Sequence, residues 1–321
     1  MDTRGVRAAL FIPAFAALMA APSLCVAQPA ANWASAVSHA AQFAPQARIV
    51  VLDVATGRLL AANHLPEAAR TLAAPGSTLK PLVLYGLVAS GRWDPSRRIA
   101  CTRKLTIAGR SLNCSHPPAG PMDARQALTW SCNTYFAAVA GTLSSGELRS
   151  LLAPTGLLSL TGLLNQTGLA GSEATAVFRD LKTPDQTRLT LLGVDGIQVT
   201  PLELATAYRW LAIQLAAHAD SAATQVVQAG LQDSASFGMA GAASLGGVSI
   251  AGKTGTASPV AGAQTRGWFI GLAPSPEPRI KEPRVKEPHV VVAVYLPAGH
   301  GSDAARVAAE LLAHSPLRPQ P

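Results

Sequence analysis

The sequence predicts an α/β protein of the α+β type, in which a sheet of about five antiparallel strands is flanked by helices and carries an inserted all-helical subdomain. A two-strand hairpin pattern comes first, over residues 48–63. A stretch of helical character with many short breaks follows from residue 93 to about 218, and three strand patterns lie between residues 248 and 296. Strand patterns thus stand on both sides of the helical stretch.

The charge pattern excludes one class of partner. The chain has 26 basic residues, 6 of them lysines, against 18 acidic residues, which gives a net charge of +8 over 321 residues. Nucleic-acid-binding proteins gather such charges in runs with interleaved aromatic residues, whereas here they are scattered. We therefore expect no nucleic-acid partner, and the mild positive field suits anionic substrates.

The first 27 residues read as a targeting segment. Arg4 and Arg7 form a basic start, residues 8–27 carry no charge, and the segment ends on the small residue Ala27. This pattern predicts a cleaved signal peptide and a protein exported to the periplasm or to the outer face of the cytoplasmic membrane. An uncleaved membrane anchor is the alternative, and either way the membrane is contacted only through this segment.

The remaining chain divides into a lead-in, one large domain and a short tail. We place the lead-in at residues 28–46, the domain at 47–315 with its helical subdomain at about 93–245, and the tail at 316–321. The strands are expected at residues 48–53, 59–63, 248–256, 268–271 and 290–296. Helices are expected at residues 77–90, 123–128, 134–143, 201–213 and 302–313.

Two features are given no catalytic role. Residues 281–288 contain a tandem Lys-Glu-Pro-x-Val repeat, which is typical of an extended polar loop. Cys101 and Cys114 flank a small hairpin tip at residues 109–111, and they either form a disulfide or stay free. Together with His116 they make an incomplete metal-ligand set, so we expect no metal and no cofactor.

The stretch Pro75-Gly76-Ser77-Thr78-Leu79-Lys80-Pro81 offers a nucleophile and a base. A Pro-Gly break followed by an apolar run predicts a helix that opens at or beside Ser77. Residues three apart share a helix face, so the Lys80 amine can reach the Ser77 hydroxyl. A lysine can accept the serine proton only if burial or a second cation lowers its pKa, and Lys253 is the candidate for that cation.

Three short motifs stand in order along the chain. They are Ser77-x-x-Lys80, Ser131-x-Asn133 and Lys253-Thr254-Gly255-Thr256. They fall on a predicted helix start, a loop between helices and a glycine-bearing strand. Each motif is weak by itself, but their joint occurrence in this order indicates one reactive site.

This set resembles the penicillin-binding serine transpeptidase superfamily, which includes the serine β-lactamases. Further segments are similar to that family: residues 51–57, the Ser-Cys-Asn-Thr-Tyr-Phe run at 131–136, residues 193–202, and the Arg-Gly-Trp-Phe-Ile-Gly run at 266–271. The resemblance spans about residues 48–313 and implies the family's antiparallel sheet with its helical insertion.

The resemblance implies a role for each catalytic candidate. Ser77 attacks a carbonyl carbon to form an acyl-enzyme, and Lys80 is its base. Ser131 passes the proton to the departing amine. Lys253 lowers the pKa of Lys80. The backbone amides of Ser77 and Thr256 form an oxyanion hole.

The resemblance also implies the substrate and its binding residues. Asn133 binds the backbone of the donor peptide, and Lys253 with Thr254, Gly255 and Thr256 holds a terminal carboxylate. The substrate implied is a peptidoglycan stem peptide ending in D-alanyl-D-alanine, which β-lactams mimic. A partner protein of cell-wall synthesis is a further expectation, because no pedestal domain is predicted ahead of the main domain.

The resemblance allows several activities within the superfamily. The Cys-Asn-Thr-Tyr-Phe run favours a D,D-transpeptidase over a D,D-carboxypeptidase or endopeptidase. A β-lactamase needs a water-activating group, and Gly162-Leu163-Leu164-Asn165 carries glycine where the commonest class has glutamate. We therefore expect a long-lived acyl-enzyme with β-lactams. The non-enzymatic alternative is a β-lactam sensor or a wall-binding scaffold.

Overall fold

A computed structural model describes residues 32–117, 119–158, 173–244, 248, 250–258, 264–274 and 288–318. The predicted signal segment, residues 281–287 of the Lys-Glu-Pro repeat and residues 162–165 lie outside these ranges. Among the residues described, no helix has the length and hydrophobicity needed to cross a lipid bilayer.

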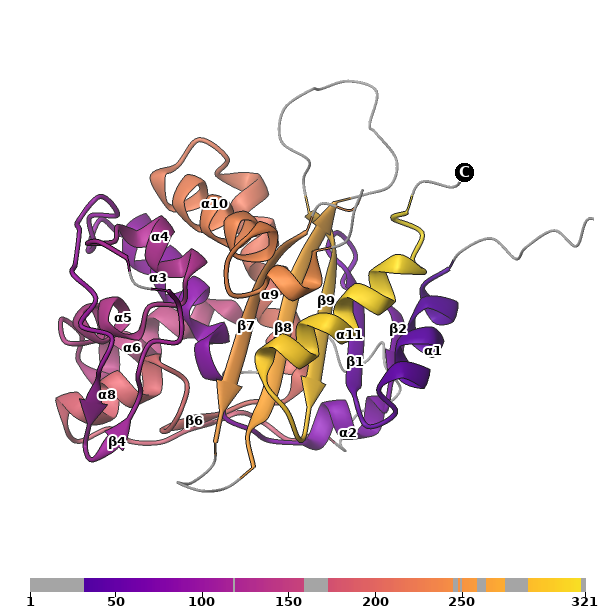
Figure 1. Ribbon diagram of the computed structural model, residues 1–321, viewed down its shortest axis with the longest axis horizontal. Helices are drawn as coiled ribbons and strands as arrows, with labels where there is room; N and C mark the ends of the chain where they lie inside the picture. Colours follow the sequence, from indigo (N-terminus) through magenta and orange to yellow (C-terminus); the bar gives the residue numbers. More distant parts are fainter. Residues whose placement is uncertain are drawn as a thin grey trace, which may run out of the picture. The chain divides into compact units, whose positions relative to one another are not determined.

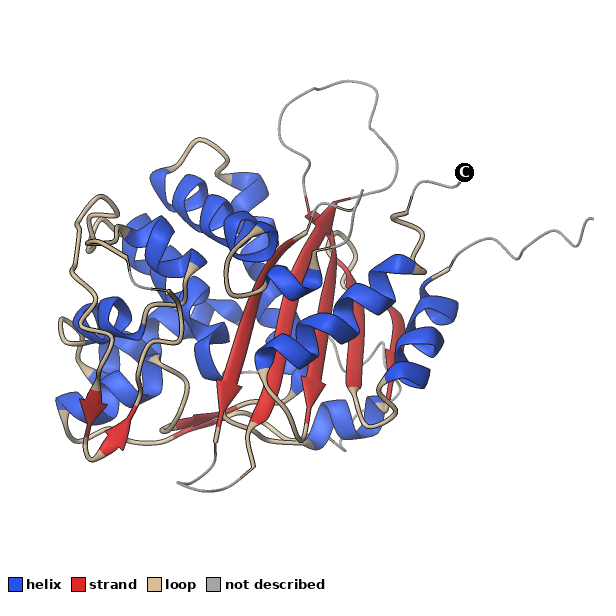
Figure 2. Cartoon of the chain, in the orientation of Figure 1, coloured by secondary structure: helices blue, strands red, loops and turns tan. Residues whose placement is uncertain are grey.

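Five strands form one antiparallel sheet in the order β2-β1-β9-β8-β7 (Figure 2). The strands are β1 (Arg48–Asp53), β2 (Leu59–Asn63), β7 (Ala251–Ala257), β8 (Arg266–Pro274) and β9 (Pro288–Leu296). The predicted five-stranded antiparallel sheet is thus confirmed. The last strand in the chain, β9, lies between β1 and β8, so the sheet joins the two ends of the sequence.

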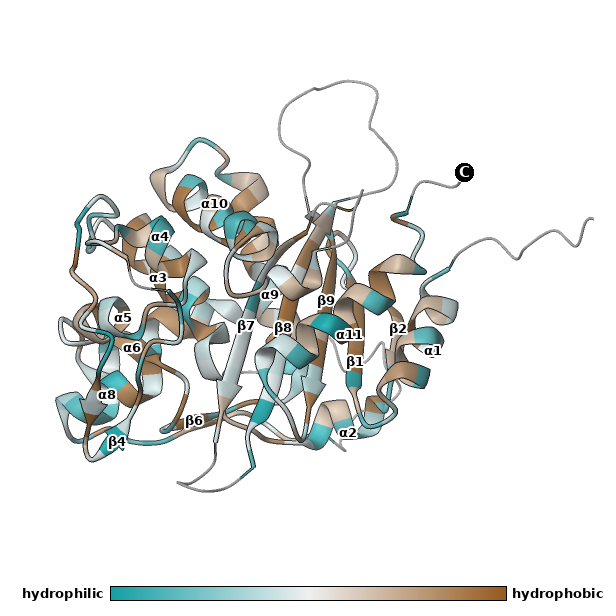
Figure 3. Ribbon diagram, in the orientation of Figure 1, coloured by the Kyte–Doolittle hydropathy of each residue, from teal (hydrophilic) through white to brown (hydrophobic). Residues whose placement is uncertain are grey.

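Successive side chains of a strand point to opposite faces of the sheet, and both faces are apolar. The hydrophobic residues of the strands are brown in Figure 3. In β1, Val50 and Leu52 belong to the core on one face and Ile49 and Val51 to the core on the other. The helices α1 (Trp33–Phe43) and α11 (Gly301–Ala313) cover the second face, and α9 (Pro201–Ala217) packs on the first (Figure 1). A strand buried on both sides explains the unbroken Ile-Val-Val-Leu run at residues 49–52.

The middle of the chain is mainly helical, as predicted. Its helices are α2 (Leu65–Arg70), α3 (Lys80–Ala89), α4 (Ala124–Thr129), α5 (Asn133–Ala140), α6 (Ser145–Leu152), α8 (Pro184–Leu191), α9 and α10 (Ala222–Ser236). Short 3₁₀ turns η1 (Gly76–Leu79), η2 (Ala153–Thr155) and η3 (Gly241–Ala243) join them. Two short ribbons, β3 (Thr106–Ile107) with β4 (Arg110–Ser111) and β5 (Val177–Phe178) with β6 (Ile197–Gln198), lie outside the main sheet.

Side chains that cap the first turn determine where several helices begin. The predicted cap of α9 is present: the Thr200 hydroxyl accepts from the Glu203 amide, and the Glu203 carboxylate accepts from the Thr200 amide. The same reciprocal pair occurs at Asp123 and Gln126, where α4 begins one residue later than the sequence suggested. Such boxes satisfy amides that a helix leaves unpaired at its first turn.

The segment around Ser77 differs from its prediction in one respect. The chain forms the 3₁₀ turn η1 over Gly76–Leu79 before α3 begins at Lys80, so Ser77 lies one turn ahead of the α-helix. Gly76 takes a left-handed backbone with φ of +58°, which a residue with a side chain adopts at a cost. Tyr208 of α9 supports this turn, because its buried hydroxyl donates to the Thr78 carbonyl at 2.8 Å.

Removal of the Tyr208 hydroxyl tests this support. In Tyr208→Phe the buried Thr78 carbonyl loses its partner, so we expect the free energy of unfolding to fall by about 1–3 kcal/mol. Tyr295→Phe is the matched control, since that buried tyrosine makes no side-chain hydrogen bond among the described residues. Urea denaturation of both variants gives the comparison, and equal losses would show that the contact with Thr78 contributes nothing.

Candidate active site

The three sequence motifs meet at one cavity of about 260 Å³. Ser77 enters from η1, Ser131 and Asn133 from the turn between α4 and α5, and Thr254 and Thr256 from β7. Motifs separated by more than 50 residues in the chain therefore line a single hollow. Ser77 is half-buried there, and among the described residues its hydroxyl has no hydrogen-bond partner.

Lys80 lies beneath the floor of this cavity and is fully buried. Its Nζ donates to the Ser131 carbonyl at 2.9 Å, to Ser131 Oγ at 3.2 Å and to Asn133 Oδ1 at 2.7 Å. The expected contact with the Ser77 hydroxyl is not formed, because three acceptors from the second motif occupy the amine. A neutral amine has only two N–H donors, so loss of the Lys80 proton frees one of these contacts.

Lys253 is also fully buried and approaches Ser131 from the sheet. Its Nζ donates to Ser131 Oγ at 2.8 Å and to the Thr254 carbonyl at 3.0 Å. Ser131 Oγ therefore accepts from both lysines, and a hydroxyl with both lone pairs used still has its own proton to donate. Lys253 was predicted to lie beside Lys80, and in the structure the two amines meet at Ser131 Oγ.

Burial dominates the electrostatics of the two lysines. It lowers the pKa of Lys80 to about 7, against a smaller opposing effect from Cys132 and Cys114. Burial, and then the charge on Lys80, holds the pKa of Lys253 well below its usual value. We expected burial or the charge of Lys253 to depress the pKa of Lys80, and burial is the main cause of its shift.

The turn that carries Ser131 is strained. Ser131 has φ of +54°, a left-handed conformation that costs a non-glycine residue about 1–2 kcal/mol. The Ser131 amide donates to the carbonyl of Leu128 in the last turn of α4. Helix α5 begins two residues after Ser131, at Asn133. This conformation brings the side chains of Ser131 and Asn133 to the same amine.

Glycines let three backbone segments meet beside Ser77. A Cβ on Gly76 would lie 2.8 Å from the Thr256 nitrogen, and one on Gly255 would lie 2.4 Å from the Pro75 carbonyl oxygen. On the other side, Gly76 N donates to the Gly193 carbonyl at 2.8 Å. Contact between the η1 turn and β7 places the amides of Ser77 and Thr256 on adjacent segments, as the oxyanion-hole prediction requires.

The predicted substrate-binding residues are partly engaged inside the protein. Asn133 uses its oxygen on Lys80, and its Nδ2 donates to the Leu112 carbonyl at 3.0 Å. The Thr256 hydroxyl accepts from the amide of Gly301, the first residue of α11, at 2.9 Å. Gly255 is not among the cavity-lining residues, and its role is the close approach of β7 to Pro75.

Two contributors to the site were not identified from the sequence. Phe136 is fully buried in the core, and its ring also lies 5.1 Å from Lys80 Nζ. Arg110, at the predicted hairpin tip, donates to the carbonyls of Val194 and Ser258, both at 3.2 Å. It thereby ties the β3–β4 ribbon to the end of β7, a contact between distant segments that no local pattern signals.

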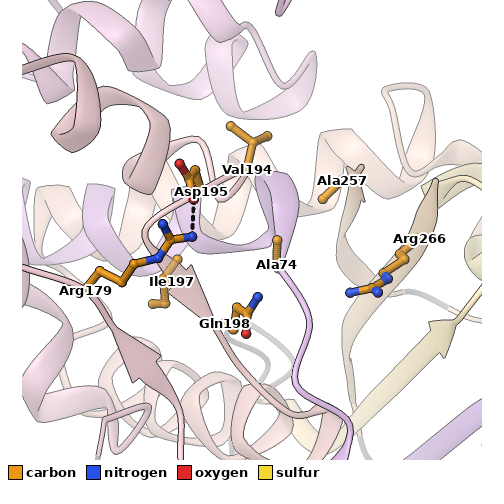
Figure 4. Close-up of a pocket in the computed structure, with 8 residues that line it drawn as sticks. All are labelled: Ala74, Arg179, Val194, Asp195, Ile197, Gln198, Ala257 and Arg266. Atoms are coloured by element: carbon orange, nitrogen blue, oxygen red, sulfur yellow. Dashed lines mark hydrogen bonds and ion pairs between the residues drawn. The ribbon is translucent and has the colours of Figure 1, made fainter. Parts of the chain in front are cut away.

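A smaller hollow of about 40 Å³ lies next to the cavity and shares Val194 with it. Figure 4 shows its polar lining, in which the Arg179 guanidinium donates to Asp195 at 2.5 Å. Gln198 and Arg266 also border this hollow. The Arg179–Asp195 pair is substantially exposed to solvent, so it contributes little to stability.

The cysteines form no disulfide among the described residues. The Cys101–Cys114 bridge considered above is not present, and Cys101, Cys114 and Cys132 are all free. His116 is buried with 1% of its surface exposed, and its Nε2 lies 3.4 Å from Cys101 Sγ.

Comparison with known proteins agrees with this architecture. Residues 47–313 match the family model of the penicillin binding protein transpeptidase domain. The fold is similar to the transpeptidase domain of Burkholderia pseudomallei penicillin-binding protein 3 in its apo form (TM-score 0.70, 21% identity, 87% of this chain and 91% of that one). It is also similar to a peptidoglycan glycosyltransferase from Burkholderia ambifaria (TM-score 0.69, 18% identity, 86% and 91% covered).

A third similar structure is Pseudomonas aeruginosa PBP2 in complex with WCK 5153, with TM-score 0.68, 22% identity and coverage of 87% of this chain and 75% of that chain. The family match covers the sheet, the helical insertion and all three motifs. By these findings the chain belongs to the penicillin-binding protein transpeptidase family.

Proposed function

We propose that this protein is an exported D,D-transpeptidase that acylates Ser77 with D-alanyl-D-alanine stem peptides of peptidoglycan and that β-lactams acylate the same serine. The observation that carries the proposal is the convergence of two buried lysines on Ser131 Oγ beside the half-buried Ser77. Export rests on the basic start and uncharged run of residues 1–27.

In the acylation step the Ser77 oxygen attacks the penultimate D-alanine carbonyl and forms a C–O bond. Lys80, as a neutral amine, takes the hydroxyl proton after exchanging one of its three present contacts for Ser77. The developing oxyanion accepts hydrogen bonds from the amides of Ser77 and Thr256. A donor of this kind lowers the barrier by about 3–4 kcal/mol in comparable sites.

In the second half of the step the C–N bond breaks and terminal D-alanine leaves as an amine. Ser131 donates its hydroxyl proton to the leaving nitrogen and regains one from Lys80, which restores the amine. Lys253 keeps Ser131 oriented from the sheet side. The amine of a second stem peptide then attacks the ester carbonyl, releases Ser77 and forms the cross-link.

The rate of acylation is expected to rise with pH and then level off. Below a pKa of about 7 Lys80 carries the proton that it must be free to accept, so the rate constant should increase about tenfold per pH unit up to that value. Acylation by a fluorescent penicillin, timed between about pH 5 and about pH 9, measures this profile. Lys104→Met, which removes an exposed lysine, should keep the same profile. A flat profile would contradict the role of Lys80.

The acyl-enzyme formed with penicillin is expected to persist. None of the described residues that line the cavity carries a carboxylate or an imidazole that could activate a hydrolytic water. We therefore expect the covalent adduct to survive for hours after excess penicillin is removed, as followed by intact-mass spectrometry. Turnover of nitrocefin at more than about one per second would instead indicate a β-lactamase.

Incubation with purified donor and acceptor stem peptides tests the natural reaction. The products of this incubation should include cross-linked dimers. In a separate reaction with penicillin, peptide mapping should place the label on Ser77. Tetrapeptide products without dimers would indicate a D,D-carboxypeptidase. Labelling of Ser77 without any peptide product, even when a cell-wall partner protein is supplied, would favour a sensor or scaffold and overturn the proposal.

A further inference from the structure

Four side chains behind the Ser131–Asn133 turn form a compact cluster. Cys101, Cys114, His116 and Cys132 each present one ligand atom, and all four atoms lie within 4.8 Å of one another. Cys114 Sγ lies 3.9 Å from Cys132 Sγ, and Cys101 Sγ lies 3.4 Å from His116 Nε2. Cys101, Cys114 and His116 lie close together in the sequence, and the fold adds Cys132 as the fourth member.

These separations fit a tetrahedral metal ion. A zinc ion bound at about 2.3 Å to sulfur and about 2.0–2.1 Å to nitrogen holds neighbouring ligand atoms about 3.5–3.8 Å apart. A disulfide would need the two sulfurs at about 2.05 Å, well inside the separation of Cys114 and Cys132. The separations of 3.9 Å and 3.4 Å are close to those of ligands around a common ion, and the 4.8 Å limit on the whole set means that any other pair needs to close by at most about 1 Å.

The surroundings favour ligation as well. His116 Nδ1 lies 2.6 Å from the Pro117 carbonyl oxygen, so Nδ1 carries the proton and the Nε2 lone pair faces the sulfurs. Backbone amides donate to two of the sulfurs, from Asn133 to Cys114 at 3.2 Å and from Arg103 to Cys101 at 3.4 Å. Such donors offset the negative charge of bound thiolates.

We propose that Cys101, Cys114, His116 and Cys132 bind one Zn²⁺ and that this ion positions the Ser131–Asn133 turn. Three thiolates and one imidazole in tetrahedral placement select zinc over the oxygen-preferring ions. No position is left open in a set of four protein ligands, so the ion has a structural role and takes no part in the acyl transfer.

The positioning role follows from the place of Cys132 in the chain. It stands between Ser131 and Asn133, so a bond from its sulfur to the ion fixes the turn that carries both. Cys114 lies two residues from Leu112, whose carbonyl accepts from Asn133 Nδ2. The ion would thus fasten the loop from Cys101 to His116 to the start of α5 and help to hold the strained backbone of Ser131.

Metal analysis of the full-length protein tests the site itself. The protein is purified without chelators or a metal-affinity tag, passed through gel filtration and analysed by mass spectrometry of its metal content. We expect about one Zn²⁺ per chain, falling at least about fivefold in Cys114→Ser and His116→Gln. His218→Gln, which changes an exposed histidine, is the matched control and should keep its zinc. Zinc content below a tenth of an ion per chain, or equal content in all variants, overturns the site.

Wild-type protein gives a second test that does not depend on how the variants fold. Titration with a thiol-blocking reagent in the presence of a chromogenic zinc indicator should release one ion as the three thiols react. Co²⁺ in place of Zn²⁺ should give the visible absorption of tetrahedral thiolate ligation. Reaction of the thiols without release of metal, or a Cys114–Cys132 disulfide found in peptide maps, would overturn the site.

The positioning role is tested by labelling, and this part rests on the proposed function. Removal of the ion by a chelator should slow acylation of Ser77 by fluorescent penicillin at least about tenfold, and added Zn²⁺ should restore the rate in wild type but not in His116→Gln. Equal rates with and without the ion overturn the positioning role. Failure of both forms to label would contradict the proposed function, and the metal content would still decide the site.

Discussion

Ser77→Ala is expected to abolish covalent labelling of the protein by penicillin. The Ser77 hydroxyl oxygen is the atom that forms the ester, whereas the other motif serine of the cavity, Ser131, already has its hydroxyl held by the Lys80 and Lys253 amines. Removal of a catalytic nucleophile typically lowers the rate by 10⁴-fold or more, so we expect a loss of at least about 10⁴-fold, below detection in a gel assay.

The same substitution should leave the fold intact. Ser77 is half-buried, and its hydroxyl has no partner among the described residues, so the free energy of unfolding should change by less than about 0.5 kcal/mol. Ser302→Ala, an exposed serine at the start of α11, serves as the control and should label normally. Labelling of Ser77→Ala at a rate near that of wild type would place the nucleophile elsewhere.

Gly193→Ala is expected to disrupt the site through the backbone. A Cβ at this position would lie 2.0 Å from the Gly76 carbonyl oxygen, and Gly193 has φ of +70°. The atom in the way is main chain, so no side-chain rotation can relieve the overlap. Left-handed strain of about 1–2 kcal/mol and overpacking of about 1–3 kcal/mol should together lower the free energy of unfolding by about 2–5 kcal/mol.

Displacement of Gly76 also moves the turn that carries Ser77, so labelling of Gly193→Ala should fall at least about tenfold even below the melting temperature. Gly146→Ala is the matched control. Nothing lies within 4 Å of its Cβ position in α6, and alanine favours a helix, so this variant should be as stable as wild type or slightly more so. Full activity and stability in Gly193→Ala would show that the two segments are not in rigid contact.

The chemistry of the site depends on a single oxygen shared by two amines. Lys80 belongs to α3 and Lys253 to β7, and each donates to Ser131 Oγ. Because both amines are fully buried, neither can be hydrated when charged, and this lowers both pKa values. Burial thus favours an uncharged Lys80 amine near pH 7.

Local patterns predicted most of the elements. Strand segments rich in β-branched residues, the Thr200 and Glu203 cap of α9, and the glycine turn before Ser77 all depend on residues close together in sequence, so they could be read directly. The η1 turn was misjudged, because a 3₁₀ turn and the first turn of an α-helix share the same residue preferences.

The partners of the buried amine could not be predicted in the same way. The motif spacing predicted a contact between Lys80 and Ser77, whereas in the structure the Lys80 amine donates to Ser131 and Asn133. Spacing of three residues permits a contact, but competition among acceptors decides which one forms. That competition depends on a turn more than 50 residues away whose backbone conformation is itself unusual.

The sequence by itself determined the order of the three motifs and the positions of most strands and helices, since these follow from residue type and short-range periodicity, and the family resemblance that the motifs carry implied the fold class and the reactive groups. Only the tertiary structure decided the strand order, the sharing of Ser131 by two lysines and the addition of Cys132 to the cysteine–histidine cluster. These features are contacts between segments far apart in the chain. They depend on packing and burial between distant segments, and such contacts produce no periodic pattern in the sequence.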